Sequence, residues 1–388
     1  MKYTLSLTIG CLAVLAMVSC EKNQTTLLNN QLEPILPEIS YDYQAENEKI
    51  NDLRLPEFSF VNSINPSFQS SEIFNGFGAP IKTKVENNDA ATLGRVLFYD
   101  SQLSKNNATA CASCHQQSKA FADGDDLSQG FGGKLTTRNS MSFTNLATNN
   151  NFFWDSRQGS MRDLVAEPVT NHIEMGMEDL PSLMEKLKKI SYYPELFEKA
   201  YGSTHIDEHR FSNAITQFMA SISSTNSSFD RAIENEFENF TEFQKLGMAV
   251  FFSNKAQCAS CHSGINFAAA DGQSGEYAST SGTANIGLDI EYADNGKEEG
   301  QFKIPSLRNI ALTAPYMHDG RFESLRDVLN HYNNNIQAHP NLDNKLRNGG
   351  NPIKIQLNSL EMDALEAFLH TLTDEKMITN PMFSNPFF

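Results

Sequence analysis

The sequence lacks the features of a disulfide-stabilised scaffold, a membrane-spanning protein or a nucleic-acid-binding protein. It has six cysteines and one tryptophan among 388 residues, and 30 basic residues stand against 47 acidic ones. The formal net charge of −17 argues against a nucleic-acid partner. The apolar run at residues 5–18 is too short to span a bilayer, and strand-like alternation is scarce. These absences leave a mostly helical protein that does not cross a membrane.

The N-terminus has the pattern of an export signal. Lys2 precedes the apolar run, whose length suits the core of a signal peptide, and the run ends in the sequence MVSC. This ending resembles a lipobox, so we expect a signal peptide at residues 1–19 and lipid on the sulfur of Cys20. An ordinary secretory signal that contains a cysteine is the alternative. The lipoprotein interpretation predicts a protein on the periplasmic side of a bacterial envelope, attached to the membrane by lipid alone.

Two short motifs account for four of the cysteines. The sequence CASCH occurs at residues 111–115 and at 258–262, and C-x-x-C-H is the attachment signature of haem c. The predicted haem-binding residues are Cys111, Cys114 and the iron ligand His115 for one haem, and Cys258, Cys261 and the iron ligand His262 for the other. The separation of the motifs is far too long for a zinc ribbon. With Cys11 in the signal peptide and Cys20 lipidated, no cysteine remains for a disulfide.

The two motifs belong to a larger internal repeat. Residues 93–98 (LGRVLF) and 246–251 (LGMAVF) precede them, and residues 154–164 match 318–328 at a constant offset of 164. The dipeptide Arg-Asn at 138–139 recurs at 308–309, which we take as a further part of the repeat. Helical spacing of apolar residues continues over 207–224 and 360–372. We therefore expect two cytochrome c-like, mostly α domains at 76–235 and 236–380, after a lipidated tether with some ordered patches at 20–75.

The two haems are not expected to be equivalent. At the offset of 164, Tyr332 in the second module corresponds to Pro168 in the first. Tyrosine can ligate iron and proline cannot, so we expect Tyr332, or alternatively its neighbour His331, as the sixth ligand of the second haem. The first haem is expected to keep an open position. The alternative is that Met141, Met161 or Met175 closes that position.

At this point a family resemblance becomes visible. Residues 314–321 (APYMHDGR) and 153–157 (FWDSR), together with both haem motifs, resemble the bacterial dihaem cytochrome c peroxidases. They are also similar to the methylamine-utilisation maturase branch of that family, which oxidises residues of another protein. The resemblance covers about residues 90–372. It implies a peroxidatic haem in the first domain and an electron-transferring haem in the second.

The resemblance also implies roles for individual residues. Trp154 would relay electrons between the haems, and Glu174 would be the acid–base group of the peroxide pocket. Oxygen ligands from Asn139, Thr313 and Pro315 would hold a structural calcium ion. These calcium ligands rest on the resemblance alone.

The sequence departs from the typical peroxidases in ways that bear on its chemistry. Those enzymes carry a methionine where Tyr332 stands, whereas tyrosine is the arrangement of the maturase. Many of them have a histidine, near Phe131 here, that blocks the peroxidatic haem until reduction. Its absence predicts a site that is open without reductive activation. Leu164 stands where the maturase pocket has a polar side chain.

Three functions follow from these patterns. The first is reduction of hydrogen peroxide with electrons from a small soluble donor, a cytochrome c or cupredoxin, which the acidic net charge suggests is basic. The second is peroxide-dependent oxidation of a protein or organic substrate, as in the maturase. The third is a non-enzymatic dihaem electron-transfer lipoprotein. A homodimer is one oligomeric state open to each of them.

Overall fold

The computed structural model describes residues 33–37, 40–56, 81–268 and 282–387. The predicted signal peptide and Cys20 lie outside these residues. Residues 37–385 form one compact unit. The described residues before 37 and after 385 form a second unit, in which Ile35 N donates to Pro386 O at 2.5 Å. Among the described residues, no helix is both long and apolar enough to cross a membrane.

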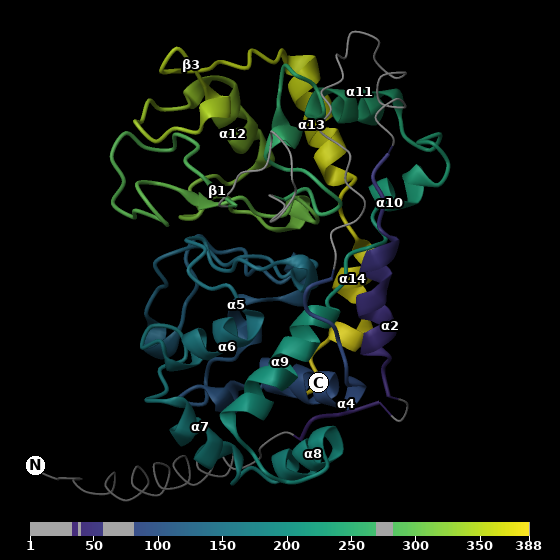
Figure 1. Cartoon of the computed structure of the whole chain (residues 1–388), viewed down its shortest axis with the longest axis vertical. Coiled ribbons are helices and arrows are strands. Elements are labelled where there is room, and N and C mark those ends of the chain that lie inside the picture. The colour runs from purple at the N-terminus through teal and green to yellow at the C-terminus, as the bar shows by residue number, and fades with distance from the viewer. Residues whose placement is uncertain (1–32, 38–39, 57–80, 269–281, 388) are drawn as a thin grey trace, which may run out of the picture. The chain divides into compact units, whose positions relative to one another are not determined.

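The compact unit is mostly helical, as predicted (Figure 1). Its first part contains α2 (Tyr43–Glu48), α4 (Asn88–Tyr99), α5 (Cys111–Cys114), α6 (Met161–Thr170), α7 (Leu180–Leu187), α8 (Tyr192–Tyr201) and α9 (Glu208–Ser221). Its second part contains α10 (Ser228–Ile233), α11 (Glu242–Phe251), α12 (Leu325–Asn330), α13 (Ser359–His370) and α14 (Glu375–Thr379). Two antiparallel pairs complete the second part: β1 (Thr283–Ala284) with β2 (Phe302–Lys303), and β3 (Arg347–Asn348) with β4 (Asn351–Pro352).

The predicted helices at 207–224 and 360–372 correspond to α9 and α13. The side chain of Asp207 accepts the backbone N–H of Arg210 and so caps α9. Asn358 and Glu361 form a capping box at the start of α13. The helix α2 is an ordered patch within the predicted tether, because Asn47 Nδ2 donates to Ala220 O of α9 at 2.7 Å.

A close helix crossing is repeated in the two modules. A Cβ atom on Gly94 of α4 would lie 1.9 Å from Ala214 O of α9. In the second module, a Cβ atom on Gly247 of α11 would lie 1.9 Å from Ala364 O of α13. Only glycine allows this approach. The repeated sequence LG before each haem motif therefore serves the same packing purpose twice.

The modules also contact each other reciprocally. Asn139 N of the first module donates to His318 O of the second at 2.8 Å. Lys303 N of the second module donates to Trp154 O of the first at 2.7 Å. Residues 139 and 303 are 164 apart, and so are 154 and 318. This exchange is the pattern of an isologous interface, so the duplicated modules face each other across a local two-fold relation.

The same offset corrects one sequence prediction. Asn309 is the counterpart of Asn145 and not of Asn139. Asn145 and Asn309 both adopt left-handed backbone conformations, with φ of 50° and 63°, and both precede a short 3-10 turn (Leu146–Thr148 and Ile310–Leu312). The recurrence of Arg-Asn at 138–139 and 308–309 is therefore wrong as a repeat pair.

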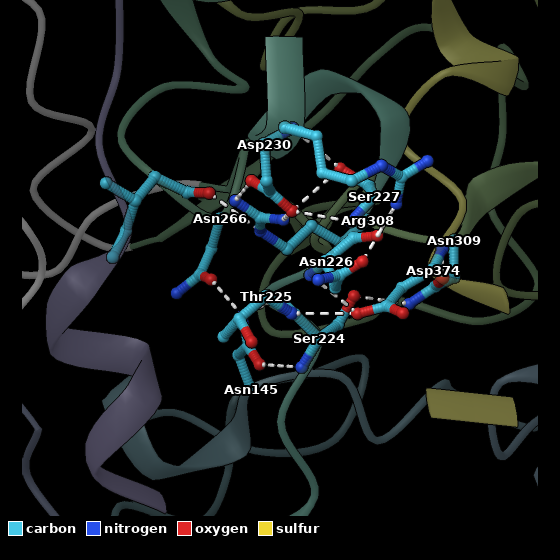
Figure 2. A network of polar contacts seen from close by, with 12 residues as sticks. Asn145, Ser224, Thr225, Asn226, Ser227, Asp230, Asn266, Arg308, Asn309 and Asp374 are labelled. Atoms are coloured by element: carbon cyan, nitrogen blue, oxygen red, sulfur yellow. Dashed lines mark hydrogen bonds and ion pairs between the residues drawn. The ribbon is translucent and has the colours of Figure 1, made fainter. Parts of the chain in front are cut away.

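These two asparagines hold the segment that joins the modules between α9 and α10 (Figure 2). Asn145 Oδ1 accepts Ser224 N at 2.7 Å, and Asn309 Nδ2 donates to Ser224 Oγ at 3.0 Å. The buried carboxylate of Asp374 accepts the N–H groups of Thr225 and Asn226 at 2.9 and 2.8 Å. The connection is thus fixed from both sides.

The chain returns to the first module after α13. Gln117 Nε2 donates to Met377 O at 3.0 Å and to Asn380 O at 2.9 Å. Further on, Tyr99 Oη donates to Phe383 O at 2.6 Å. The helix α14, which the predicted boundary at residue 380 assigns to the second domain, therefore packs against the first.

Candidate functional site

Residues of both modules line one cavity of about 490 Å³. Among them are all the described site residues that the sequence predicted, leaving aside the alternative iron ligands. They are Cys111, Cys114, His115, Asn139, Trp154, Glu174, Cys258, Cys261, His262, Thr313, Pro315 and Tyr332. Residues more than 200 positions apart in the sequence thus meet in one space.

The first histidine is oriented by the loop that follows it. His115 Nδ1 bonds to Phe121 O at 2.8 Å, and Phe121 has the left-handed φ of 64° that brings its carbonyl back. The imidazole ring stacks on Phe143 at 4.0 Å. Burial lowers the pKa of His115, which favours the neutral ring. A neutral imidazole with Nδ1 held by a carbonyl leaves Nε2 as a metal ligand.

The second histidine repeats this arrangement. His262 Nδ1 bonds to Phe267 O and to Pro305 O, both at 3.2 Å. Phe267 again has a left-handed φ, of 50°. Burial lowers the pKa of His262 to about 4. Both histidines therefore have the orientation that an axial haem ligand needs.

The four motif cysteines are free thiols that line the same cavity. Burial raises the pKa of Cys111 and that of Cys258 to about 12, so both side chains favour the uncharged state in this cavity. The described residues contain no cluster of three His, Cys, Asp or Glu side chains that could hold a metal ion. An uncharged thioether to haem suits this environment. The donor set fits two haem c groups.

Glu174 lies in the loop that follows α6. Asn171 Nδ2 donates to its Oε1 at 2.7 Å. Burial raises the pKa of Glu174, nearby Arg157 lowers it and Glu167 raises it. Many of the other residues that line the cavity are apolar. They include Leu164, Val165, Pro168, Ile173 and Met175.

The three methionines differ in their access to the first haem site. Met161 is buried and is not one of the cavity-lining residues. Met141 lines the cavity directly after Ser140, whose hydroxyl contacts His115 Nδ1 at 3.2 Å, so it lies on the histidine side. Met175 lines the cavity next to Glu174. Of the three, Met141 and Met175 therefore line the cavity, and Met161 does not.

The segment around Phe131 packs against the loop that contains Glu174. Phe131 N donates to Ile173 O at 2.6 Å and to Glu174 O at 2.8 Å. A Cβ atom on Gly176 would meet the Phe131 ring at 2.6 Å, so the ring covers this glycine. Phe131 is not among the residues that line the cavity. Phe131, near which the resemblance places a blocking histidine, is therefore turned away from the pocket.

Trp154 lies at the contact between the modules. Its Nε1 donates to Asn139 O at 2.9 Å. Its counterpart His318 stacks on Phe302 with 3.6 Å between ring centres. His318 Nδ1 is buried and has no hydrogen-bond partner in the described part of the chain.

Tyr332 and His331 point to different surroundings. Tyr332 lines the cavity near Cys258 and Cys261, and burial raises its pKa well above the usual value. His331 Nε2 bonds to Ile286 O at 3.0 Å. Both residues belong to a π-helical turn at His331–Asn335, a feature that often marks functional sites and that no pattern in the sequence announces.

The residues predicted to bind calcium all line the cavity. Asn139 Nδ2 donates to Asp125 O at 2.9 Å, which fixes the amide and leaves Oδ1 facing away from that carbonyl. Calcium prefers such oxygen ligands. The calcium site stays a prediction.

The fold and the cavity define a helical protein with two c-type haem sites in a duplicated framework. A family model described as di-haem cytochrome c peroxidase matches residues 88–238. The methylamine utilization protein MauG of Methylophilus methylotrophus is 31% identical over 293 residues, covering 73% of this chain and 82% of that protein. The cytochrome c551 peroxidase of Nitrosomonas europaea is 29% identical over 300 residues, covering 76% and 84%.

Solved structures agree with the sequence relatives. A MauG-like protein associated with microbial copper homeostasis has a TM-score of 0.68 at 30% identity, covering 82% of this chain and 99% of that one. The diheme peroxidase BthA of Burkholderia thailandensis shares the fold, with a TM-score of 0.61 at 21% identity over 76% and 89% of the two chains. The chain belongs to the di-haem cytochrome c peroxidase family, whose members are oxidoreductases that carry two haem c groups.

Proposed function

We propose that this protein reduces hydrogen peroxide to water at the haem of the first module, with electrons relayed from the haem of the second. The observation that carries the proposal is the position of Glu174. Its side chain lines the same cavity as His115. A proton-transferring carboxyl in the cavity where a histidine would hold the haem iron is what peroxide cleavage requires.

The haem held by Cys111, Cys114 and His115 supplies the iron at which peroxide is reduced. Glu174 would accept a proton from one peroxide oxygen and return it to the other, which leaves as the first water. The remaining oxygen would become the second water with two electrons from the donor and two protons from solvent. Asn171 Nδ2 binds Oε1 and thereby fixes the carboxyl, so that Oε2 is the oxygen that carries the proton. Leu164 and Pro168 exclude water from the pocket, and Pro168 offers no ligand that would compete with peroxide.

The second module supplies the electrons in this proposal. Cys258, Cys261 and His262 hold its haem, and Tyr332 is the sixth ligand. Tyr332 rather than His331 is supported by its place in the cavity and by the bond of His331 to Ile286 O. Trp154 lies between the modules and relays the electrons, which come from a small soluble donor, a cytochrome c or cupredoxin.

Further parts of the proposal concern assembly and location. Asn139, Thr313 and Pro315 hold a structural calcium ion between the modules. The protein works on the periplasmic side of a bacterial envelope, attached through lipid on Cys20. We take the domain boundaries as 76–235 and 236–380, with α14 packed on the first domain.

A second candidate function is peroxide-dependent oxidation of a protein or organic substrate. Tyr332 and the absence of a histidine near Phe131 favour it, since both distinguish the chain from typical peroxidases. Similarity to the methylamine utilization protein MauG also supports it.

The experiment that separates the functions is a titration of the fully oxidised protein with peroxide, followed by optical and EPR spectroscopy. The peroxidase proposal expects a high-spin ferric signal that is consumed by one equivalent of peroxide and regenerated by a reduced cytochrome c. A long-lived oxidised state of both haems that the cytochrome does not discharge favours the second function. A protein with two low-spin haems and no reaction would be an electron carrier.

A further inference from the structure

The contact between the modules contains an arginine that bridges them next to Trp154. Arg138 Nε and Nη2 donate to the two carboxylate oxygens of Asp294 at 2.6 and 2.8 Å. Its Nη1 donates to Asp155 Oδ2 at 2.7 Å. Asp155 belongs to the first module and follows Trp154 directly, whereas Asp294 belongs to the second. One guanidinium therefore joins both modules through three charge-assisted bonds.

Arg138 directly precedes the residue that binds the indole of Trp154. The next residue, Asn139, accepts the indole N–H of Trp154 with its carbonyl at 2.9 Å. The same residue donates its own N–H to His318 O of the second module at 2.8 Å. The position of the Asn139 peptide thus sets the position of the indole, and the side chain of Arg138 anchors that peptide to both modules.

The anchor has no counterpart in the repeat. At the offset of 164, the residue equivalent to Arg138 is Phe302, and the two meet, with the guanidinium 5.9 Å from the ring centre. Phe302 in turn stacks on His318, the counterpart of Trp154. At this pair of equivalent positions the contact therefore has a guanidinium in the first module and an aromatic ring in the second.

We propose that Arg138 is a positioning residue for Trp154, which fixes the indole between the haems by binding Asp155 and Asp294 at once. The proposal rests on the relay role of Trp154 proposed above. The side chain of Arg138 is only 20% exposed. The side chains of Asp155 and Asp294 are 17% and 32% exposed, so the ion pairs are shielded from solvent. Arg138 itself exchanges neither electrons nor protons.

The test uses the full-length protein with both haems and follows the indole directly. Trp154 is the only tryptophan of the chain, so ultraviolet resonance Raman bands of indole report this residue alone. We expect Arg138→Gln to shift the band that is sensitive to the indole N–H hydrogen bond. Arg138→Lys should restore part of the signal, because one ammonium can keep one carboxylate.

Two further variants isolate the cause. Asp294→Asn removes the link to the second module, leaves Arg138 bound to Asp155, and should reproduce the shift. Arg326→Gln is the matched control. Arg326 also binds two carboxylates, those of Asp363 and Glu366, but at 36% exposure and between helices α12 and α13. It should leave the indole bands unchanged.

A kinetic readout separates this proposal from the relay itself. When less than one electron per molecule is added, the electrons redistribute between the two haems. The rate of this redistribution depends on the electronic coupling of the haems, and the change in haem absorption measures it. Arg138→Gln should slow this rate, and Arg138→Lys should recover part of the loss. If Trp154→Phe leaves the rate unchanged, the relay fails, and the indole bands alone decide on Arg138. Unchanged bands in Arg138→Gln and Asp294→Asn would overturn the positioning role.

Discussion

At the scale of single residues, the proposed proton transfer depends on the environment of Glu174. Apolar side chains withdraw its carboxyl from water, which raises its pKa, whereas Arg157 partly offsets this and Glu167 adds to it. A carboxyl with a raised pKa holds a proton more readily in the working range of the enzyme. This is the property that lets one group first accept and then return a proton.

Turnover should therefore fall at acidic pH as Glu174 becomes protonated. Because burial raises its pKa, the acid limb should lie above 4.5, the ordinary value of a glutamate. Glu174→Gln should remove this limb and lower peroxide turnover by about 10²- to 10⁴-fold. Arg157→Gln should move the limb to higher pH, because Arg157 favours the charged carboxylate.

The measurement is the pH profile of kcat/KM for peroxide. Glu178→Gln is the control, since Glu178 lies four residues further on, is 55% exposed and binds Lys105. An acid limb that survives in Glu174→Gln would assign the titration to another group.

A second prediction at this scale concerns the ligand of the second haem. Tyr332→Phe keeps the ring and removes the oxygen, so the second haem should lose its sixth ligand and show a new high-spin ferric signal by EPR. His331→Gln should leave the second haem low-spin, because the ring nitrogen of His331 is bound to Ile286 O. The opposite pattern in the two variants would make His331 the ligand.

These residues also show what local sequence can predict. The motif residues at 111–115 are fixed by their spacing within one helical turn, and the sequence alone was sufficient to name them. The choice between Tyr332 and His331 depends on the π-helical turn that orients both side chains. That turn results from tertiary packing, so the sequence left the choice open.

At the scale of secondary-structure elements, the two helix crossings are equivalent supports for the haem modules. Gly94 lets α4 approach α9, and Gly247 lets α11 approach α13. The sequence predicted these helices from their periodicity. It did not predict which helix crosses which, because the partners are more than 100 residues apart.

Gly94→Ala and Gly247→Ala should each destabilise the protein by about 1–3 kcal/mol or more, the cost of overpacking, because the helices must move apart. Denaturant unfolding followed by far-ultraviolet circular dichroism measures the effect. Gly159→Ala is the control, since its Cβ would lie 3.7 Å from Asn150 O in ordinary contact. Equal stability of all three variants would contradict the crossing argument.

At the scale of the whole molecule, the duplication explains both likeness and difference between the halves. The reciprocal bonds of Asn139 and Lys303 keep the modules in a two-fold relation, whereas Pro168 against Tyr332 and Arg138 against Phe302 break it. The sequence revealed the duplication through its constant offset. It gave no sign of which repeated residues meet across the interface, and the false pairing of 138–139 with 308–309 shows this.

The buried network around the connecting segment should make the two modules unfold as one. Asp374 is 2% exposed and accepts four backbone N–H groups, two from Thr225 and Asn226 and two from the first turn of α14. Asp374→Ala leaves these buried donors without their acceptor, at a cost of about 3 kcal/mol or more. It also releases α14 from the connecting segment.

Calorimetry of the haem-loaded protein should show one unfolding transition for the wild type and two for Asp374→Ala. The second transition arises because each module keeps its own helix crossing and haem after the connection is lost. Asp363→Ala, which removes a carboxylate that is 52% exposed and bound to Arg326, should keep a single transition. A single transition in Asp374→Ala would mean that the other contacts between the modules, among them those of Asn139, Lys303 and Arg138, are enough to couple them.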